Sequence, residues 1–214
     1  QAPWAEGQNV RHLEPMGFIK FDLLGLSTLK MMEGAIYHIL RRHHGVEEPT
    51  FAQVRDYYTQ YLHPDALDLN DQEVYQNIFH PGKWAGVFQF TEHGAQNFCT
   101  KAKPNSIIDI SAITSIFRPG PLSAGVDADY IDAKEQPHYV SYLSEEAREI
   151  TEETFGFLIF QEQIALLGHK LGGLTLDEGN LLRKVLTKKG TGKNSVKGKL
   201  HKKFITGCVD KGIP

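Results

Sequence analysis

Asp22 and Lys20 are the residues whose types and spacing first suggest chemistry. Successive side chains of a β-strand point to opposite faces. A strand from Phe18 to Leu23 would therefore place both charged groups on one face and apolar side chains on the other. A carboxylate in such apolar surroundings requires a compensating positive charge. Lys20 and a divalent cation could each supply it, and the spacing alone favours a plain Lys–Asp ion pair. One aspartate is too few for Mg²⁺, whose further oxygen ligands would have to come from elsewhere.

The C-terminal segment suggests a second kind of chemistry, because positive charge is concentrated there. Residues 181–214 contain ten Lys or Arg residues and one acidic residue, a charge of +9, whereas residues 1–180 carry −12. A capping box at Thr175-Leu-Asp-Glu178 predicts a helix that presents Arg183 and Lys184 on one side. The opposite, packed side is expected to carry Leu181, Leu182, Val185 and Leu186. Such a segment indicates contact with nucleic acid or a nucleotide, and the alternative is a solvated basic tail.

Three shorter motifs are ambiguous when each is taken alone. Arg118-Pro-Gly-Pro121 is expected to form a rigid turn that holds the arginine in a fixed direction. Phe88-Gln89 and Phe160-Gln161 could each be a core aromatic residue beside a hydrogen-bonded amide. The segment around Lys193 resembles half of a phosphate-binding loop, but it lacks the first glycine, the hydroxyl after the lysine and a preceding strand.

The composition excludes several classes of protein. Of the 214 residues, 41% are apolar and 23% are charged, which is typical of globular proteins and unlike a fibre or a disordered tail. No run approaches the roughly 18 apolar residues of a membrane helix, and no secretory signal is visible. The two cysteines form neither a disulfide framework nor a metal knuckle, so a reducing compartment, the cytoplasm, is expected. The sequence lacks an initiator methionine and is expected to be part of something longer.

The apolar pattern predicts a mainly α-helical fold with a small β contribution. Helices are expected at about 28–44, 50–62, 71–80, 91–103, 105–117, 157–171, from 175 onward, and at 199–211. Strands are expected at 18–23 and 86–90, and a flexible basic loop at 190–199. Ser27 or Thr28 is expected to cap the first helix.

Seven short blocks occur in one order along residues 17–213. They are Lys20-Phe-Asp-Leu-Leu-Gly-Leu26, Gly86-Val-Phe-Gln89, Phe117-Arg-Pro-Gly-Pro121, Thr154-Phe-Gly156, Phe160-Gln-Glu-Gln163, Leu181-Leu-Arg-Lys184 and Lys188-Lys189. In this order and spacing they resemble the alpha (catalytic) subunit of bacterial replicative DNA polymerase III, a C-family polymerase. Each block is weak by itself, but the ordered set is highly specific.

The resemblance implies a domain plan and a set of site residues. Residues 1–27 would end the palm domain with the last palm strand, and residues 28–214 would belong to a largely helical fingers domain with a basic helix-loop-helix at 175–212. Asp22 falls on a catalytic, metal-binding carboxylate, and Lys20 falls on the lysine beside it. The residues expected to bind nucleotide or DNA are Arg118, Arg183, Lys184, Lys188, Lys189 and Lys193. The family usually has Arg-Arg where this sequence has Arg-Lys. Lys184 keeps the positive charge but lacks the planar guanidinium that can donate two hydrogen bonds to one phosphate.

The resemblance also implies an activity and partners. The reaction would add deoxynucleotides to a primer 3′-hydroxyl by two-metal phosphoryl transfer with Mg²⁺ during DNA replication. The expected partners are primer–template DNA, dNTP, the remaining polymerase segments, a sliding clamp and other replisome proteins, but no membrane. The family's first two catalytic aspartates are absent from this sequence, so the isolated chain is expected to be inactive. The alternatives are a non-catalytic DNA- or nucleotide-binding module, one part of a split polymerase, and a helical scaffold with a solvated basic end.

Overall fold

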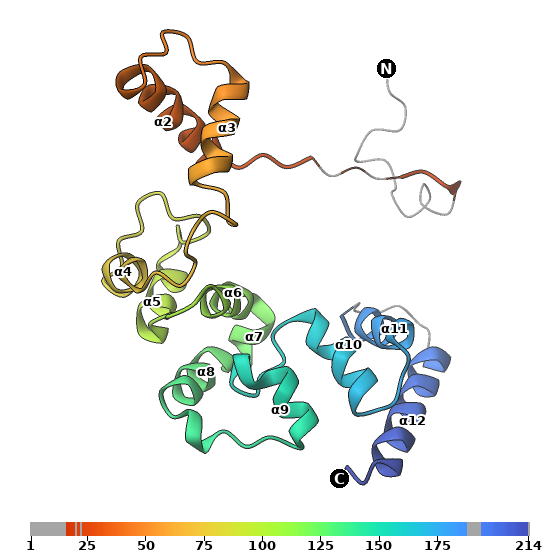
Figure 1. The fold of residues 1–214 in the computed structure, drawn as a ribbon. Coiled ribbons are helices and arrows are strands. Elements are labelled where there is room, and N and C mark those ends of the chain that lie inside the picture. The colour runs from red at the N-terminus through yellow and green to blue at the C-terminus, as the bar shows by residue number, and fades with distance from the viewer. Residues whose placement is uncertain (1–15, 20, 22, 188–193, 214) are drawn as a thin grey trace. The chain divides into compact units, whose positions relative to one another are not determined.

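A computed structural model describes residues 16–19, 21, 23–187 and 194–213 (Figure 1). The chain divides into two compact units, Gln1–Ala66 and Leu67–Pro214. Every regular element of the described residues is a helix, so the prediction of a mainly helical fold is confirmed. Of these described helices, none combines the length and the apolar character that a membrane crossing requires.

The first unit contains a pair of helices, α2 (Ser27–His43) and α3 (Phe51–Tyr61), each within one residue of its predicted bounds. Its buried core consists of Ile36, Leu40 and Val54. Thr50 caps α3, because its hydroxyl accepts a hydrogen bond from the Gln53 amide at 3.4 Å and its own amide donates to Gln53 Oε1 at 2.9 Å. The expected cap of α2 is wrong: Leu26 occupies that position and makes no side-chain capping bond.

The described part of the predicted strand before α2 is not a strand. None of the described residues between 18 and 23 is in a strand, and Ile19, Phe21 and Leu23 are 78%, 80% and 94% exposed. A strand needs a hydrogen-bonded neighbour, and no second strand is found in the described part of the chain to pair with it. Lys20 and Asp22 lie outside the described residues.

The second unit begins with six helical segments. They are α4 (Gln72–Val74) with its π-helical continuation η2 (Tyr75–Phe79), α5 (His93–Ala102), α6 (Ile107–Ile116), α7 (Pro119–Ser123) and α8 (Val126–Glu135). Their shared core includes Phe90, Phe98, Cys99, Ala112, Ile113, Ile116 and Tyr130. The predicted strand at 86–90 is wrong, because turns replace it, with positive φ angles of 79° at Gly86 and 66° at Gln89.

The same unit continues with a second group of helices. They are η3 (Pro137–Tyr139), α9 (Glu145–Thr151), η4 (Glu152–Thr154), α10 (Gln161–Lys170), α11 (Leu176–Thr187) and α12 (Asn194–Asp210). The predicted start of the 157–171 helix is four residues early. The final helix begins at Asn194, inside the predicted loop at 190–199, and residues 188–193 lie outside the described range.

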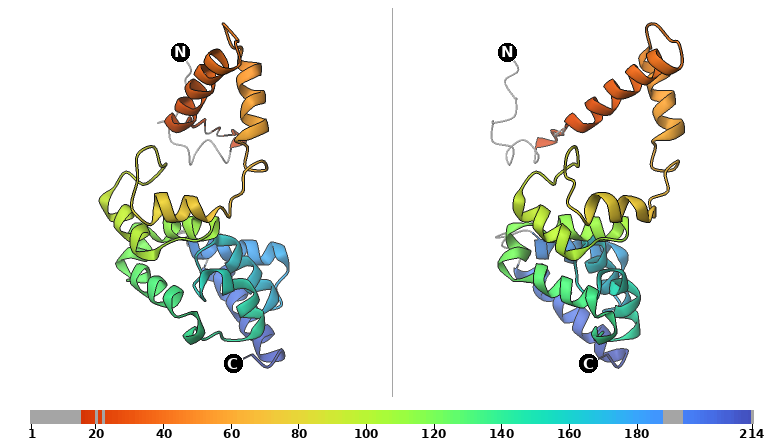
Figure 2. Two further views of the ribbon diagram at one scale, coloured as in Figure 1. Left: turned by 60° about the vertical axis from the view of Figure 1, so that its left-hand side comes forward. Right: turned by 90° about the vertical axis from the view of Figure 1, so that its left-hand side faces the viewer.

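Glycines allow α10, α11 and α12 to pack backbone against backbone (Figure 2). A Cβ atom at Gly207 of α12 would lie 2.0 Å from the carbonyl oxygen of Gly172, directly after α10. A Cβ atom at Gly172 would lie 2.2 Å from Cδ2 of Phe204, and one at Gly179 would lie 2.6 Å from the carbonyl oxygen of Ala165. These spacings leave no room for a larger residue, so the approach of the three helices depends on glycine.

A buried ion pair joins α6 to α8. The side chains of Asp109 and Lys134 are only 8% and 11% exposed and form a direct ion pair. The same carboxylate accepts hydrogen bonds from the Tyr130 hydroxyl at 3.2 Å and from the Asn105 amide at 2.8 Å. Burial, followed by the charge of Asp109, raises the pKa of Tyr130 above its ordinary value, which keeps the phenol a hydrogen-bond donor. The charge of Asp109 is therefore balanced and hydrogen-bonded inside the core.

Candidate functional site

Arg118 lies between two helices that fix its backbone. Its amide donates a hydrogen bond to the carbonyl of Ile116, the last residue of α6, at 2.6 Å. Its carbonyl accepts from the amide of Leu122 at 3.1 Å, so Arg118 is the N-cap of α7. The Pro-Gly-Pro stretch ends α6 as predicted, but it opens a short helix instead of forming a plain turn. Proline suits the first position of a helix, where no backbone donor is needed.

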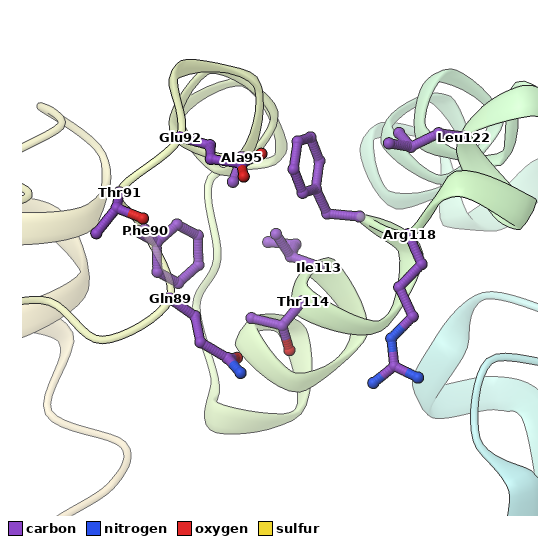
Figure 3. A pocket seen from close by; sticks show the side chains of 10 residues that line it. Gln89, Phe90, Thr91, Glu92, Ala95, Ile113, Thr114, Arg118 and Leu122 are labelled. Carbon is purple, nitrogen blue, oxygen red and sulfur yellow. The ribbon is translucent and has the colours of Figure 1, made fainter. Parts of the chain in front are cut away.

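A pocket of about 560 Å³ lies beside Arg118 (Figure 3). Its apolar lining consists of Phe90, Ala95, Ile113, Phe117 and Leu122. Figure 3 shows that the side chains of Gln89, Thr114 and Arg118 end in polar groups on the same side of this pocket. An amide, a hydroxyl and a guanidinium beside apolar surface form the combination that binding sites for small molecules use.

Gln89 reaches this pocket from a strained backbone. Its φ of 66° lies in the left-handed region, which costs a residue with a side chain on the order of 1–3 kcal/mol. The next residue, Phe90, is buried and stacks on Trp84 with ring centroids 5.0 Å apart. The Gln96 side chain donates a hydrogen bond to the Phe90 carbonyl at 2.8 Å. These contacts hold Gln89 at the pocket, which the motif Phe88-Gln89 alone did not indicate.

The capping box predicted at the start of α11 is confirmed. The Thr175 amide donates to Glu178 Oε2 at 2.8 Å, and the Glu178 amide donates to Thr175 Oγ1 at 3.2 Å. Hydrogen bonding to Lys203, then to the Thr175 backbone, lowers the pKa of Glu178 and keeps it a carboxylate. The predicted packed face is only partly correct. Leu182 and Val185 are half-buried, whereas Leu181 and Leu186 are 41% and 54% exposed.

Arg183 connects two motifs that are separate in the sequence. Its Nη1 donates a hydrogen bond to Oε1 of Gln161, the first residue of α10. Arg183 is half-buried, and its neighbour Lys184 is exposed. Gln161 was not among the predicted site residues, although it belongs to the ambiguous pair Phe160-Gln161 and to the block Phe160-Gln-Glu-Gln163. The guanidinium is therefore directed by a contact between α10 and α11.

Gln163 fixes the end of α10 that carries Gln161. Its Oε1 accepts hydrogen bonds from the amides of Ile159 and Phe160, both at 2.9 Å. Its Nε2 donates to the Ile150 carbonyl at 3.1 Å and to the Thr154 hydroxyl at 2.8 Å. This buried side chain therefore has partners for both its oxygen and its nitrogen, and it secures the turn that leads into α10.

Three of the predicted site residues, Arg118, Arg183 and Lys184, lie in the unit Leu67–Pro214, and Arg183 and Lys184 are neighbours in α11. The other predicted site residues, Lys20, Asp22, Lys188, Lys189 and Lys193, lie outside the described residues. Their convergence with Arg183 stays a prediction. The described residues contain no group of three or more His, Cys, Asp or Glu side chains that could hold a metal ion.

The fold and the charge define a helical domain with a strongly basic C-terminal segment. Residues 29–212 match the family model of the bacterial DNA polymerase III alpha subunit finger domain. The chain belongs to this family, which confirms the resemblance seen in the sequence.

Three relatives, each a DNA polymerase III subunit alpha, illustrate the similarity. The relative from Aquifex aeolicus (strain VF5) is 34% identical over 202 residues, which cover 94% of this chain and 16% of the relative. Those from Halalkalibacterium halodurans and Campylobacter jejuni are each 31% identical, over 99% and 94% of this chain and 17% and 15% of the relatives. The chain thus spans about a sixth of the length of these relatives.

Proposed function

We propose that this chain is the fingers section of a template-directed DNA polymerase that acts in replication. The observation that carries the proposal is the family match over residues 29–212. In this proposal residues 1–27 end the palm domain, residues 28–214 belong to the fingers, and 175–212 is a basic helix-loop-helix. The substrates are primer–template DNA and dNTP. The remaining polymerase segments, a sliding clamp and other replisome proteins are partners through regions that this chain does not contain.

The basic residues have a physical role in this proposal. In phosphoryl transfer a protein mainly positions the phosphates and neutralises their charge. Arg183, held by Gln161, would offer the incoming triphosphate a directed guanidinium, and Lys184 would add an exposed point charge. Arg118 would present its guanidinium beside the pocket. Lys188, Lys189 and Lys193 would extend the same positive surface toward nucleotide or DNA.

The described residues contain no cluster of three or more His, Cys, Asp or Glu side chains that could hold Mg²⁺. Mg²⁺ prefers six oxygen ligands, commonly from more than one carboxylate or phosphate. Asp22, beside Lys20, would supply one carboxylate, and the described residues offer no cluster that supplies the others. We therefore place the missing ligands on other polymerase segments, and the isolated chain is expected not to extend primers.

A graft tests the proposed function. This chain would replace the matching segment of the Aquifex aeolicus relative, which aligns with it over 202 residues. The graft is expected to extend a primer on a template with dNTP, whereas the isolated chain is not. The unmodified relative serves as the positive control. A graft that folds and binds DNA but incorporates no nucleotide would contradict the proposal.

Within this graft, Gln161→Glu is expected to raise the KM for dNTP about tenfold, with a smaller change in kcat. The new carboxylate would pair with Arg183 and compete with the triphosphate, and hydrogen bonds to charged groups contribute about 1.5–3 kcal/mol. Gln161→Ala is expected to have a smaller effect, because it removes the hydrogen-bond partner without neutralising the charge. Steady-state kinetics with varied dNTP measure both.

A matched control separates this effect from general electrostatics. Gln136→Glu adds the same charge at an exposed position in the turn after α8 and is expected to leave the KM unchanged. If Gln161 only supported the fold, glutamate would be tolerated, because it retains an acceptor for Arg183. If the KM of Gln161→Glu for dNTP were unchanged, Arg183 would not contact the incoming nucleotide.

The second candidate function is a non-catalytic module that binds DNA or nucleotide. It is favoured by the charge of +9 in residues 181–214. It and the first proposal are compatible, because a fingers section without the palm carboxylates would still bind DNA. A DNA affinity of the isolated chain that does not change with salt would contradict this candidate and favour the helical scaffold with a solvated basic end.

A further inference from the structure

A basic groove lies along α12, and its described lining includes none of the predicted site residues. The groove has a volume of about 650 Å³ and runs along α12 next to the turn at Gly172 and Gly173. Lys199, Lys202 and Lys203 line it from α12. Lys199 lies one turn before the other two, and residues spaced by three or four share one face of a helix, so the three ammonium groups gather on one side of α12.

The packing of α12 explains why these lysines face outward and why the groove is open. Gly207 and Gly172 bring α12 and the end of α10 into backbone contact. Phe204 points inward, where its ring would touch a Cβ atom at Gly172 at 2.2 Å. The glycine turn has no side chains to fill the groove. The face of α12 that carries Phe204 and Gly207 therefore packs against the turn at Gly172, and the lysines lie beside this face.

The lysines of the groove differ in how they are neutralised. Lys203 forms an ion pair with Glu178 at 2.7 Å, and Lys211 donates a hydrogen bond to the Lys170 carbonyl. Lys199 and Lys202 are exposed, and no carboxylate of the described residues lies within ion-pair distance of either. Two positive charges therefore remain available for a ligand at the end of the groove nearer the N-terminus of α12.

We propose that this groove binds the phosphodiester backbone of duplex DNA. The identification of the polyanion as DNA rests on the proposed function. Lys199 and Lys202 lie about one turn apart on one face of α12, with a helical rise of about 4.5 Å between them. Their two ammonium groups can therefore contact neighbouring phosphates of one strand. Asp210 also lines the groove and repels phosphate there, so the main contacts are those of Lys199 and Lys202.

The chemistry of the groove indicates that it contacts the backbone and does not recognise bases. Among the described residues, no aromatic side chain lines it, whereas surfaces for single-stranded nucleic acid stack bases on aromatic rings. Its described lining also has no Arg, Asn or Gln, which are the side chains that pair with base edges. Lysines act as point charges, so the contact is independent of sequence and tracks the duplex.

The test compares two double variants that change the net charge equally. Lys199→Gln with Lys202→Gln removes the two available charges of the groove. Lys197→Gln with Lys101→Gln removes two exposed lysines outside it, one on another side of α12 and one on α5. All four side chains are exposed, so both variants should melt at the temperature of the unchanged chain. Fluorescence anisotropy would measure the Kd for a labelled duplex between 50 and 200 mM salt.

The groove variant is expected to bind the duplex more weakly and with a shallower salt dependence. Each lost phosphate contact lowers the slope of log K against log salt by about 0.9, so the loss of two lowers it by about 1.8. The control variant should retain nearly the full slope. If both variants lost the same affinity for the duplex, the groove would not be the binding site. The proposed polymerase function would be unaffected, because the graft experiment tests it separately.

Two further measurements separate the possible occupants. The groove variant should lose less affinity for single-stranded DNA than for the duplex, and free dNTP should not displace the duplex at equal phosphate concentration. A larger loss with single-stranded DNA, or displacement by dNTP, would overturn the assignment to a duplex backbone.

Discussion

Replacing Asp22 with asparagine in the graft is expected to abolish primer extension. Asparagine keeps the shape of the side chain but removes the negative charge, so it cannot contribute a carboxylate to a Mg²⁺ site. No acidic cluster among the described residues could take over this role. The measurement is extension of a labelled primer over a range of Mg²⁺ concentrations, and the affinity of the same variant for primer–template DNA is measured beside it.

The DNA affinity distinguishes a catalytic role from a structural one. Removing a negative charge near DNA does not weaken the attraction of its phosphates, so the binding of Asp22→Asn should stay close to that of the unchanged graft. Asp132→Asn, at an exposed position of α8, provides a control with the same chemical change and should extend primers normally. Ordinary extension by Asp22→Asn would show that Asp22 is not a metal ligand, and the plain ion pair with Lys20 would then be the better interpretation.

The parts of the fold that were predictable from the sequence are those set by local chemistry. Thr50 begins α3 and Thr175 begins α11, because each hydroxyl caps a helix that follows at once. The structure also contains α7, α8 and α9, which the sequence pattern did not indicate. A local signal existed for α9, since Ser144 accepts a hydrogen bond from the Ala147 amide at 3.2 Å. By contrast, α8 begins after Gly125 without a side-chain cap.

The features that the sequence pattern missed depend on partners distant in the chain. An apolar run such as Phe18–Leu23 becomes a strand only beside another strand, and the described residues provide none. Residues 86–90 form turns in place of a strand, because the Phe90 ring stacks on Trp84 and the Phe90 carbonyl accepts a hydrogen bond from the Gln96 side chain. In the site, the contact between Gln161 and Arg183 joins residues 22 positions apart. No spacing rule relates two such helices, so family resemblance identified the arginine but not the glutamine.

Replacing Asp109 with alanine is expected to destabilise the unit Leu67–Pro214 by about 3–5 kcal/mol, the usual cost of breaking a buried ion pair from one side. The change would leave the ammonium of Lys134, 11% exposed, without its carboxylate, and it would remove the acceptor of the Tyr130 hydroxyl. With a urea m-value of about 2 kcal/mol/M, the unfolding midpoint should fall by about 2 M. Urea titration followed by circular dichroism measures this shift.

Two comparison variants show whether the unpaired charge is the cause. The double variant Asp109→Leu with Lys134→Met should recover most of the loss, because an apolar pair of similar volume often replaces a buried ion pair at little cost. Asp132→Asn changes an exposed carboxylate of α8 and should shift the midpoint little. If the double variant were no more stable than Asp109→Ala, the loss would come from packing and not from the charge of Lys134.

The ion pair also connects stability to the candidate site. Asp109 lies in α6, the helix that carries Ile113 and Thr114 into the pocket and ends at Ile116, two residues before Arg118. Lys134 lies in α8, which follows α7 and its N-cap Arg118. The pair therefore fixes the helices before and after the pocket, and its loss should loosen Arg118 even where the chain remains folded. In the graft, Asp109→Ala should reduce primer extension at temperatures below its unfolding transition, whereas the double variant should restore it.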